Sequence, residues 1–447
     1  MDAEAGRRAA PLAAGLDLPC YQGGSLNDVL PAIGVALGVP KAGAPTDSGA
    51  DPGAYPSAYA GADPGASDRP AGLTGSGYLP QSDYPAPNMT PVQPTLRRPC
   101  ADLVLEPVRR ACLFLIDGMG SELIAAHPDS APYLSSLLAA EDDRGHTLTA
   151  GFPSTTSTSL SSIGTGLTPG AHGMLGYRLA VPGSGRLMNF LKWDQDVDPF
   201  VWQAKETMWE RFARSGLAVT HVTSPRFADS GLTRSVFRGA RFAGAEPPHQ
   251  RAADALDALE AAGPGLVYLY YSDLDFVGHT AGVASPAWLD QLRYVDSLVQ
   301  WLAERLPRDS ALYVVADHGM VNVPQEHRID VDNDPELCAG VALLGGEARA
   351  RHVYAQPGAA RDVLAIWAER LDGLAEVRSR RAAIEEGWFG PRVDPGFAER
   401  IGDVVVAMSS DWAITATERE AVDARQIGMH GSMTAAEQLV PFLEVRR

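Results

Sequence analysis

Residues 111–117 of the chain read ACLFLID, a short apolar run that ends in a carboxylate. Such a run is typical of a strand buried on both faces of a parallel sheet. Two further runs have this character, GLVYLYY at 265–271 and LYVVA at 312–316. Helical patterns alternate with these runs, at 132–140, 201–215, 251–262 and 286–306. The alternation predicts an α/β core with a largely parallel sheet covered by helices on both faces.

The segments around these runs differ in composition. Residues 1–40 contain a helical pattern at 25–37 that we expect to dock on the main body. Residues 41–98 are rich in Ala, Gly and Pro, which predicts a disordered insertion because little apolar surface is available for burial. The catalytic core would then comprise residues 99–323 and a final segment, 426–447.

Residues 324–425 change character again and predict a small α+β cap. We expect a helix at 359–371 and strands at 341–344, 352–355, 375–378 and 403–408.

Composition limits the classes of function. A net charge of −18 argues against duplex nucleic acid and anionic membranes as partners, because both need clustered Lys and Arg. The chain has no apolar run of about 18 residues, and residues 1–18 lack a signal pattern, so we expect a cytoplasmic protein without membrane association. Four cysteines without a CxxC pair indicate neither a disulfide scaffold nor a thiolate zinc site.

Acidic and imidazole side chains follow the three predicted strands. Taken alone, each has an ordinary interpretation, such as a helix cap or a surface histidine. Taken together they form a ligand inventory sufficient for two metal ions: Asp117, Asp275, His279, Asp317, His318 and His430. Mixed Asp and His ligands without thiolates suit zinc or manganese. Metal ions would also supply the positive charge that an anionic substrate needs in so acidic a chain.

A hydroxyl-rich loop, GFPSTTSTSL at 151–160, runs into a predicted helix that ends near residues 164–166. A hydroxyl at a helix N-terminus can act as a nucleophile, because free N–H groups and the helix dipole favour an oxyanion there. Composition alone leaves several hydroxyls as candidates, and a simple capping run is the alternative.

These motifs, in this order, resemble the nucleotide pyrophosphatase/phosphodiesterase branch of the alkaline phosphatase superfamily, which also includes phosphonoacetate hydrolase. The resemblance covers most of the chain from residue 111 to 443 and implies an alkaline-phosphatase-like core with Thr156 as the nucleophile. It also implies two metal sites, one formed by Asp275, His279 and His430 and the other by Asp117, Thr156, Asp317 and His318.

The chain departs from the family pattern in one respect. Many relatives place an oxyanion-binding asparagine where this sequence has Tyr177, and Asn189 is a second candidate for that role. We therefore take Tyr177 and Asn189 as substrate-binding candidates. Neither the sulfatase signature nor the serine of true alkaline phosphatases is present, which disfavours sulfate and monoester hydrolysis.

Within the family, the chain is most similar to soluble actinobacterial phosphodiesterases that depend on manganese and act on cyclic di-AMP. This similarity implies a monomeric phosphodiesterase that hydrolyses cyclic di-AMP to pApA and AMP, with Mn2+ favoured and Zn2+ possible as the two ions. Tyr177, Phe190, Trp193 and Trp202 are candidates for stacking on adenine, with burial in the core as the alternative. A broader nucleotide pyrophosphatase, a phosphonoacetate hydrolase and a non-catalytic nucleotide-binding protein remain alternatives.

Overall fold

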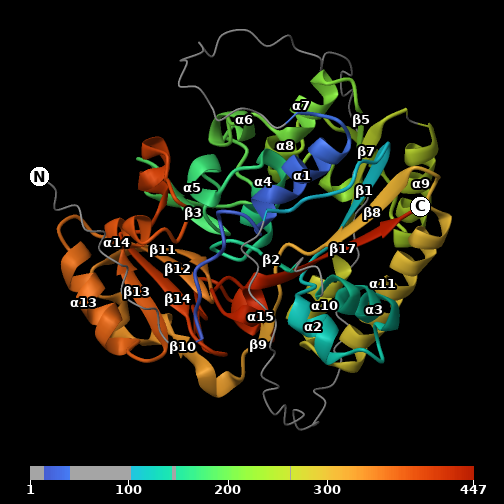
Figure 1. Ribbon diagram of the computed structural model, residues 1–447. Coiled ribbons are helices and arrows are strands. Elements are labelled where there is room, and N and C mark those ends of the chain that lie inside the picture. The colour runs from blue at the N-terminus through green and yellow to red at the C-terminus, as the bar shows by residue number, and fades with distance from the viewer. Residues whose placement is uncertain (1–14, 41–101, 143–146, 262) are drawn as a thin grey trace, which may run out of the picture. The chain divides into compact units, whose positions relative to one another are not determined.

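The computed structural model describes residues 15–40, 102–142, 147–261 and 263–447 (Figure 1). The predicted disordered insertion, residues 41–98, lies outside the described residues.

A seven-stranded sheet forms the centre of the fold, with strand order β2-β17-β8-β1-β7-β5-β6. Five neighbouring strands run parallel, whereas β17 is antiparallel to both β8 and β2. The strands are β1 (Arg110–Ile116), β2 (Thr147–Thr149), β5 (Ala218–Thr223), β6 (Arg241–Gly244), β7 (Gly265–Tyr271), β8 (Ser310–Val315) and β17 (Leu439–Arg446). Strands β1, β7 and β8 coincide with the three apolar runs of the sequence, so the predicted α/β class with a largely parallel sheet is confirmed.

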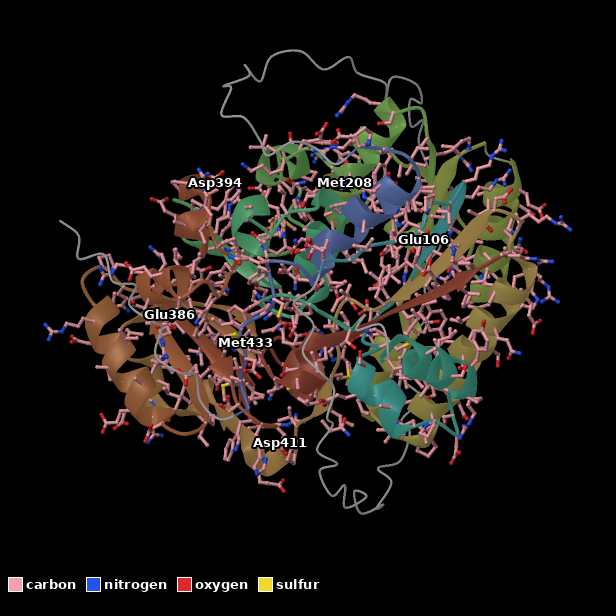
Figure 2. All side chains as sticks on the ribbon, viewed as in Figure 1. Glu106, Met208, Glu386, Asp394, Asp411 and Met433 are labelled. Carbon is pink, nitrogen blue, oxygen red and sulfur yellow. The ribbon has the colours of Figure 1, made fainter. Side chains whose placement is uncertain are left out.

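Helices cover both faces of this sheet (Figure 1). One face carries α1 (Val29–Ala36), α4 (Thr156–Thr165), α7 (Met208–Arg214) and α8 (Gly231–Val236). The other carries α3 (Pro132–Asp142), α9 (Pro248–Ala261) and α11 (Pro286–Arg305). Side chains fill the space between the helices and the sheet (Figure 2). β7 and β8 are therefore buried along their whole length, which explains their unbroken apolar sequence.

The helix predicted at 201–215 is wrong as a single element. The chain forms α6 (Pro199–Trp202) and then α7 (Met208–Arg214). Between them the buried Gln203 side chain accepts from the backbone N–H of Lys205 at 2.7 Å, and Thr207 caps α7 together with Glu210. These local hydrogen bonds replace helical ones and end the first helix early.

A second sheet, β11-β12-β14-β13, belongs to the part of the chain predicted to be the cap. Its strands are β11 (Val341–Glu347), β12 (Ala350–Ala355), β13 (Ala375–Ser379) and β14 (Val404–Met408), and α13 (Ala360–Arg370) packs on them. The predicted strands and helix of this region agree with these elements. A separate apolar cluster that includes Val353, Trp367 and Val406 lies within it.

A buried ion pair joins this region to the last segment of the core. Arg349, in the turn between β11 and β12, donates to both carboxylate oxygens of Glu437, at 2.7 and 2.8 Å. Both side chains are fully buried. Glu437 also accepts from the backbone N–H of Ser432 at 2.9 Å, so the pair fixes the loop that contains His430.

The described cysteines are in two states. Cys112 and Cys338 are free, whereas Cys20 is disulfide-bonded.

Candidate active site

Polar side chains gather beyond the carboxyl ends of three adjacent parallel strands. Asp117 directly follows β1, Asp317 lies two residues after β8, and Asp275 lies in the first turn of α10 (Asp273–Ala281), the helix that follows β7. Since β1 pairs with both β7 and β8, the three carboxylates meet at one edge of the sheet. Open α/β sheets place their ligand sites at this edge.

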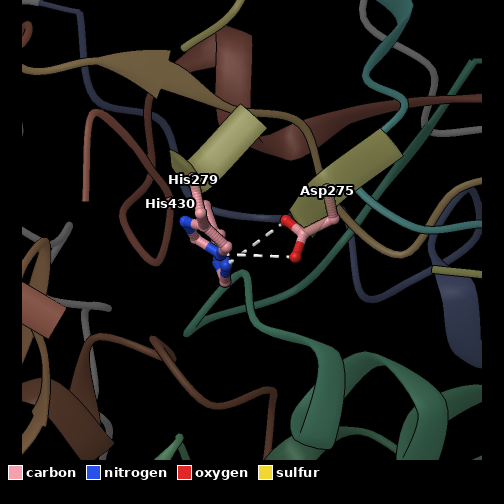
Figure 3. A group of neighbouring side chains, drawn as sticks. All are labelled: Asp275, His279 and His430. Carbon is pink, nitrogen blue, oxygen red and sulfur yellow. Dashed lines mark ion pairs between the residues drawn. The ribbon is translucent and has the colours of Figure 1, made fainter. Parts of the chain in front are cut away.

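One group consists of Asp275, His279 and His430 (Figure 3). The spacing of four residues puts Asp275 and His279 on the same side of α10, with 3.3 Å between Oδ2 and Nε2. His430 comes from the loop after β16 (Gly428–Met429), and its Nε2 lies 3.9 Å from Oδ1 of Asp275. One ligand atom from each residue lies within 4.8 Å of the others, close enough to share an ion.

The second group is centred on His318. Its Nε2 lies 3.4 Å from Oδ1 of Asp117, 3.5 Å from Oδ2 of Asp317 and 3.3 Å from Oγ1 of Thr156. Asp117, His318 and Asp275 also satisfy the distances for a shared ion, so Asp275 lies between the two groups. The structure thus brings together all seven residues predicted for the metal sites.

The three histidines are oriented in the same way. Nδ1 of His279 lies 2.7 Å from the carbonyl of Gly428, and those of His318 and His430 lie 2.9 Å from the carbonyls of Gly319 and Ser154. A carbonyl can only accept, so each Nδ1 carries a proton and Nε2 is the ring atom directed at the carboxylates of the site. A hydrogen bond from the ring nitrogen that does not bind the metal to a backbone carbonyl is typical of metal-binding histidines.

The carboxylates fit a bound cation. Oδ1 of Asp117, Oδ1 of Asp275 and Oδ2 of Asp317 are buried and find no hydrogen-bond partner within the described parts of the chain. Burial and the neighbouring carboxylates of Asp317 and Asp275 raise the pKa of Asp117 well above its usual range. Burial would lower the pKa of His279, but Asp275 outweighs this effect and raises it to about 9. A divalent cation would satisfy these oxygens and relieve the repulsion between them.

Thr156 is the first residue of α4, as the predicted loop-to-helix transition requires. Three other hydroxyls of the loop are engaged by backbone carbonyls, those of Ser154, Ser157 and Ser159, at 2.8, 2.8 and 2.7 Å. The Thr156 hydroxyl instead faces His318 and lines a cavity of about 320 Å3. Thr155 also lines the cavity, but its side chain is hydrogen-bonded to Glu347, so Thr156 is the hydroxyl of this loop that faces His318.

Tyr177 lines the same cavity, whereas Asn189 does not. The Asn189 side chain accepts from the backbone N–H groups of Leu191 and Lys192, at 2.9 and 3.2 Å, and is hydrogen-bonded to Tyr177. Asn189 therefore does not contact the cavity itself, and it acts on the cavity by holding the Tyr177 side chain.

Three of the four aromatic candidates for stacking on adenine lie away from the cavity, as the alternative of burial in the core predicts for Phe190 and Trp202. Phe190 packs against Trp193 and Trp202 with ring centroids 5.5 Å apart in each case, and none of the three lines the cavity. Phe190 and Trp202 are buried in the core.

Glu347 and Arg226 are among the cavity-lining residues that were not singled out from the sequence. Glu347, at the end of β11, brings a carboxylate from the four-stranded sheet, with Oε2 3.5 Å from Nδ1 of His430. Burial raises the pKa of Glu347 well above its usual range, and its Oε1 has no partner among the described residues. Arg226 is the sole Arg or Lys among the described residues that line the cavity, and it donates to Oγ of Ser272 at 3.1 Å.

A hydroxyl surrounded by carboxylates and imidazoles, at the carboxyl edge of a mostly parallel sheet, defines an α/β protein with a candidate hydrolytic centre. The chain belongs to the type I phosphodiesterase/nucleotide pyrophosphatase family, whose model matches residues 111–433. Membership agrees with the resemblance found in the sequence and indicates hydrolase activity.

Known proteins similar to this chain share that description. An uncharacterized pyrophosphatase/phosphodiesterase of Schizosaccharomyces pombe is 25% identical over 204 residues, which span 42% of this chain and 40% of that protein. Murine ectonucleotide pyrophosphatase/phosphodiesterase 5 has the same fold, with a TM-score of 0.61 at 19% identity over 75% of this chain and 88% of that one. An inactive variant of the murine protein in complex with AMP gives 0.60 at 18% identity, over 75% of this chain and 87% of that one. The human counterpart gives 0.57 at 18% identity over the same shares.

None of the described helices is both long and apolar enough to cross a membrane.

Proposed function

We propose that this chain is a phosphodiesterase that cleaves nucleotide phosphodiesters with Thr156 as its nucleophile. The observation that supports this most is the position of the Thr156 hydroxyl at the N-terminus of α4, 3.3 Å from Nε2 of His318 and inside the cavity. The free N–H groups of that helix end suit the charge that builds up on a phosphate under attack.

The reaction proceeds by double displacement. Thr156 Oγ1 loses its proton and attacks phosphorus, an Oγ1–phosphorus bond forms, and the bond to the leaving ribose oxygen breaks as that oxygen gains a proton. The resulting threonyl-phosphate ester still carries the other nucleoside. Water then attacks its phosphorus, the Oγ1–phosphorus bond breaks, Oγ1 regains a proton, and the nucleotide leaves with a terminal phosphate. A cyclic dinucleotide is opened to the linear dinucleotide in one such cycle and yields two mononucleotides in a second.

Two divalent ions complete the site in this proposal. Asp275, His279 and His430 hold one of them, and Asp117, Thr156, Asp317 and His318 hold the other. When bound, such ions lower the pKa of a coordinated hydroxyl and stabilise the entering and leaving oxygens. Mn2+ is favoured and Zn2+ is compatible, because the donors are carboxylates and imidazoles without thiolates.

The favoured substrate is cyclic di-AMP. The sequence resemblance to cyclic di-AMP phosphodiesterases suggests it, and the cavity wall supports it. Tyr177 offers an aromatic ring for stacking, with Asn189 holding its hydroxyl, and Arg226 offers a guanidinium for the phosphate that is not being cleaved.

One assay tests the activity and the substrate together. Protein loaded with manganese is incubated with cyclic di-AMP, pApA, a nitrophenyl nucleotide ester and phosphonoacetate, and the products are separated by chromatography. We expect pApA and then AMP from cyclic di-AMP. Cleavage of phosphonoacetate alone would identify a phosphonoacetate hydrolase, whereas binding of nucleotides without turnover would identify a non-catalytic protein.

Two isosteric variants test the nucleophile. Thr156→Val removes the proposed nucleophile and is expected to abolish turnover while manganese binding persists. Thr158→Val is the matched control, because its hydroxyl lies on the same helix, is buried and makes no hydrogen bond within the described residues. Retained turnover in the first variant would show that another hydroxyl attacks.

We propose a monomer in the cytoplasm, and both points are open to direct measurement. Light scattering on purified protein tests the monomer. The disulfide at Cys20 is more typical of oxidising compartments, so cell fractionation decides the location.

A further inference from the structure

Two loops carry the proposed nucleophile and one imidazole of the candidate metal site. The nucleophile loop, residues 150–155, joins β2 to α4 and ends immediately before Thr156. The histidine loop, residues 430–434, joins β16 to α15 (Ala435–Gln438) and begins with His430. The loops are far apart in the sequence, so contacts within the folded chain set their relative position.

Ser154 connects the two loops directly. Its Oγ donates to the carbonyl of Ser432 at 2.8 Å and accepts from the backbone N–H of Gly431 at 3.2 Å. Its backbone N–H donates to the carbonyl of Gly431 at 3.0 Å, and its carbonyl accepts from Nδ1 of His430 at 2.9 Å. One buried serine of the nucleophile loop therefore holds three consecutive residues of the histidine loop.

Gln438 bridges the same two loops from the end of α15. Its side chain is 3% exposed, and its Oε1 accepts from the backbone N–H of Gly151 at 3.1 Å. Its Nε2 donates to the carbonyls of Gly151 and Ser432, at 2.7 and 2.9 Å. Reversing the amide would turn its oxygen toward two carbonyls, which can only accept. The amide therefore has one orientation, in which it holds a residue of each loop.

The backbone of Gln438 is anchored to the central sheet. Its carbonyl accepts from the N–H of Ala150 at 2.8 Å, and the next residue, Leu439, begins β17. β17 pairs with β2, which leads into the nucleophile loop, and with β8, which leads to Asp317. Gln438 is thus a fixed point of attachment for both loops.

Among the described residues that line the cavity, neither Gln438 nor its partners Gly151 and Ser432 occur, so its amide acts only through other residues. We propose that Gln438 is a positioning residue, which holds the Thr156 hydroxyl and the His430 imidazole at the separation that the reaction requires. This inference rests on the proposed function of those two residues. A displacement of about 1 Å in reacting groups can lower a rate about 100-fold.

Two glutamines with the same hydrogen-bonding pattern test this role. Gln438→Met keeps the length of the side chain and removes its acceptor and its donors. Gln203→Met is the matched control, because Gln203 is also buried and its bonds lie outside both loops. Its Oε1 accepts from the N–H of Lys205 at 2.7 Å, and its Nε2 donates to the carbonyls of Lys205 and Ser235, at 3.2 and 3.1 Å. Each variant removes three hydrogen bonds from backbone groups, so both should lower the unfolding temperature to a similar extent.

Only the first variant should impair the reaction. At saturating Mn2+, we expect Gln438→Met to lower kcat for the p-nitrophenyl ester of AMP about 10- to 100-fold, with KM within about twofold of wild type. Gln203→Met should keep both constants within about twofold of wild type. Equal falls of kcat in the two variants would show a general effect of lost stability and would overturn the proposal.

A binding measurement separates this inference from the proposed function. Calorimetric titration with Mn2+ requires no turnover and reports the position of His430 through the metal site. Gln438→Asn joins the comparison, because it retains an amide that is one methylene too short to reach both loops and so disturbs the fold less. We expect Mn2+ to bind about tenfold more weakly to both Gln438 variants, and with wild-type affinity to Gln203→Met.

The two possible failures are distinguishable. If wild type binds Mn2+ but hydrolyses no ester, the proposed function fails while the titration still decides the role of Gln438. Wild-type Mn2+ affinity in both Gln438 variants would overturn the positioning role, whatever the activity of the protein.

Discussion

The buried pair of Arg349 and Glu437 gives a prediction whose size follows from the structure. Arg349→Met keeps most of the volume of the side chain but removes its charge and its donors. Glu437 would then remain buried with a negative charge and without its two charge-assisted hydrogen bonds of 2.7 and 2.8 Å. The backbone carbonyl of Ser410 would also lose its donor at 2.7 Å. Breaking such a pair from one side costs about 3–5 kcal/mol of unfolding free energy.

Urea denaturation followed by tryptophan fluorescence and circular dichroism measures this loss. The double variant Arg349→Met/Glu437→Gln should recover part of it, because a neutral glutamine does not leave a buried charge uncompensated. Arg381→Met is the matched control, since the ion pair of Arg381 with Glu385 is exposed, and its expected effect is below about 1 kcal/mol. A loss below about 1 kcal/mol in Arg349→Met, or additive losses in the double variant, would refute the reasoning.

Three further predictions concern the site itself. Glu347→Gln should lower kcat/KM about 10- to 100-fold with metal content retained, because its carboxylate lies 3.5 Å from Nδ1 of His430; unchanged kinetics would exclude a role for its charge. Chelation of bound metal should lower the unfolding temperature. Adding Mn2+ at about 100 times its Kd should raise the free energy of unfolding by about 2.7 kcal/mol, whereas an unfolding temperature that does not depend on Mn2+ would contradict binding to the folded state. Gly319→Ala should weaken Mn2+ affinity and stability together, because a Cβ there would lie 1.9 Å from the carbonyl oxygen of Ala436; wild-type behaviour in both measurements would be inconsistent with this packing.

The sheet and much of the site could be predicted from the sequence. Strands β1, β7 and β8 are buried on both faces, so their apolar runs were unambiguous. Asp117 follows β1 directly and Asp317 lies two residues after β8, and the parallel arrangement then brings them to one edge. The four-residue spacing of Asp275 and His279 likewise placed them on one side of a helix.

Other features depended on tertiary contacts that no local pattern records. The break at Gln203 arises from side-chain hydrogen bonds, and the helical periodicity on either side of it concealed the interruption. Glu347 reaches the site from the end of β11 in the four-stranded sheet, and the signal available was a carboxylate after the glycine pair 345–346. Gly346 has a φ of 75° and faces the carbonyl of Ala350. The glycine pair therefore indicates a backbone conformation that favours glycine, and it does not indicate a nearby site.

The surroundings of His221 could not be predicted from the sequence for a similar reason. His221 lies within β5, and its apolar surroundings of Phe237 and Tyr268 come from other segments of the chain. A histidine inside a strand is ordinarily a satisfied core residue, and only the three-dimensional structure shows that one of its nitrogens is unpaired.

Attack by Thr156 on phosphorus is the claim on which the mechanism depends, and the stereochemical course of the reaction tests it most directly. A diester made chiral at phosphorus by sulfur substitution is hydrolysed in isotopically labelled water, and the configuration of the product is determined. Two successive in-line displacements, by the threonine and then by water, predict overall retention. Inversion would show a single attack by water and would contradict the account.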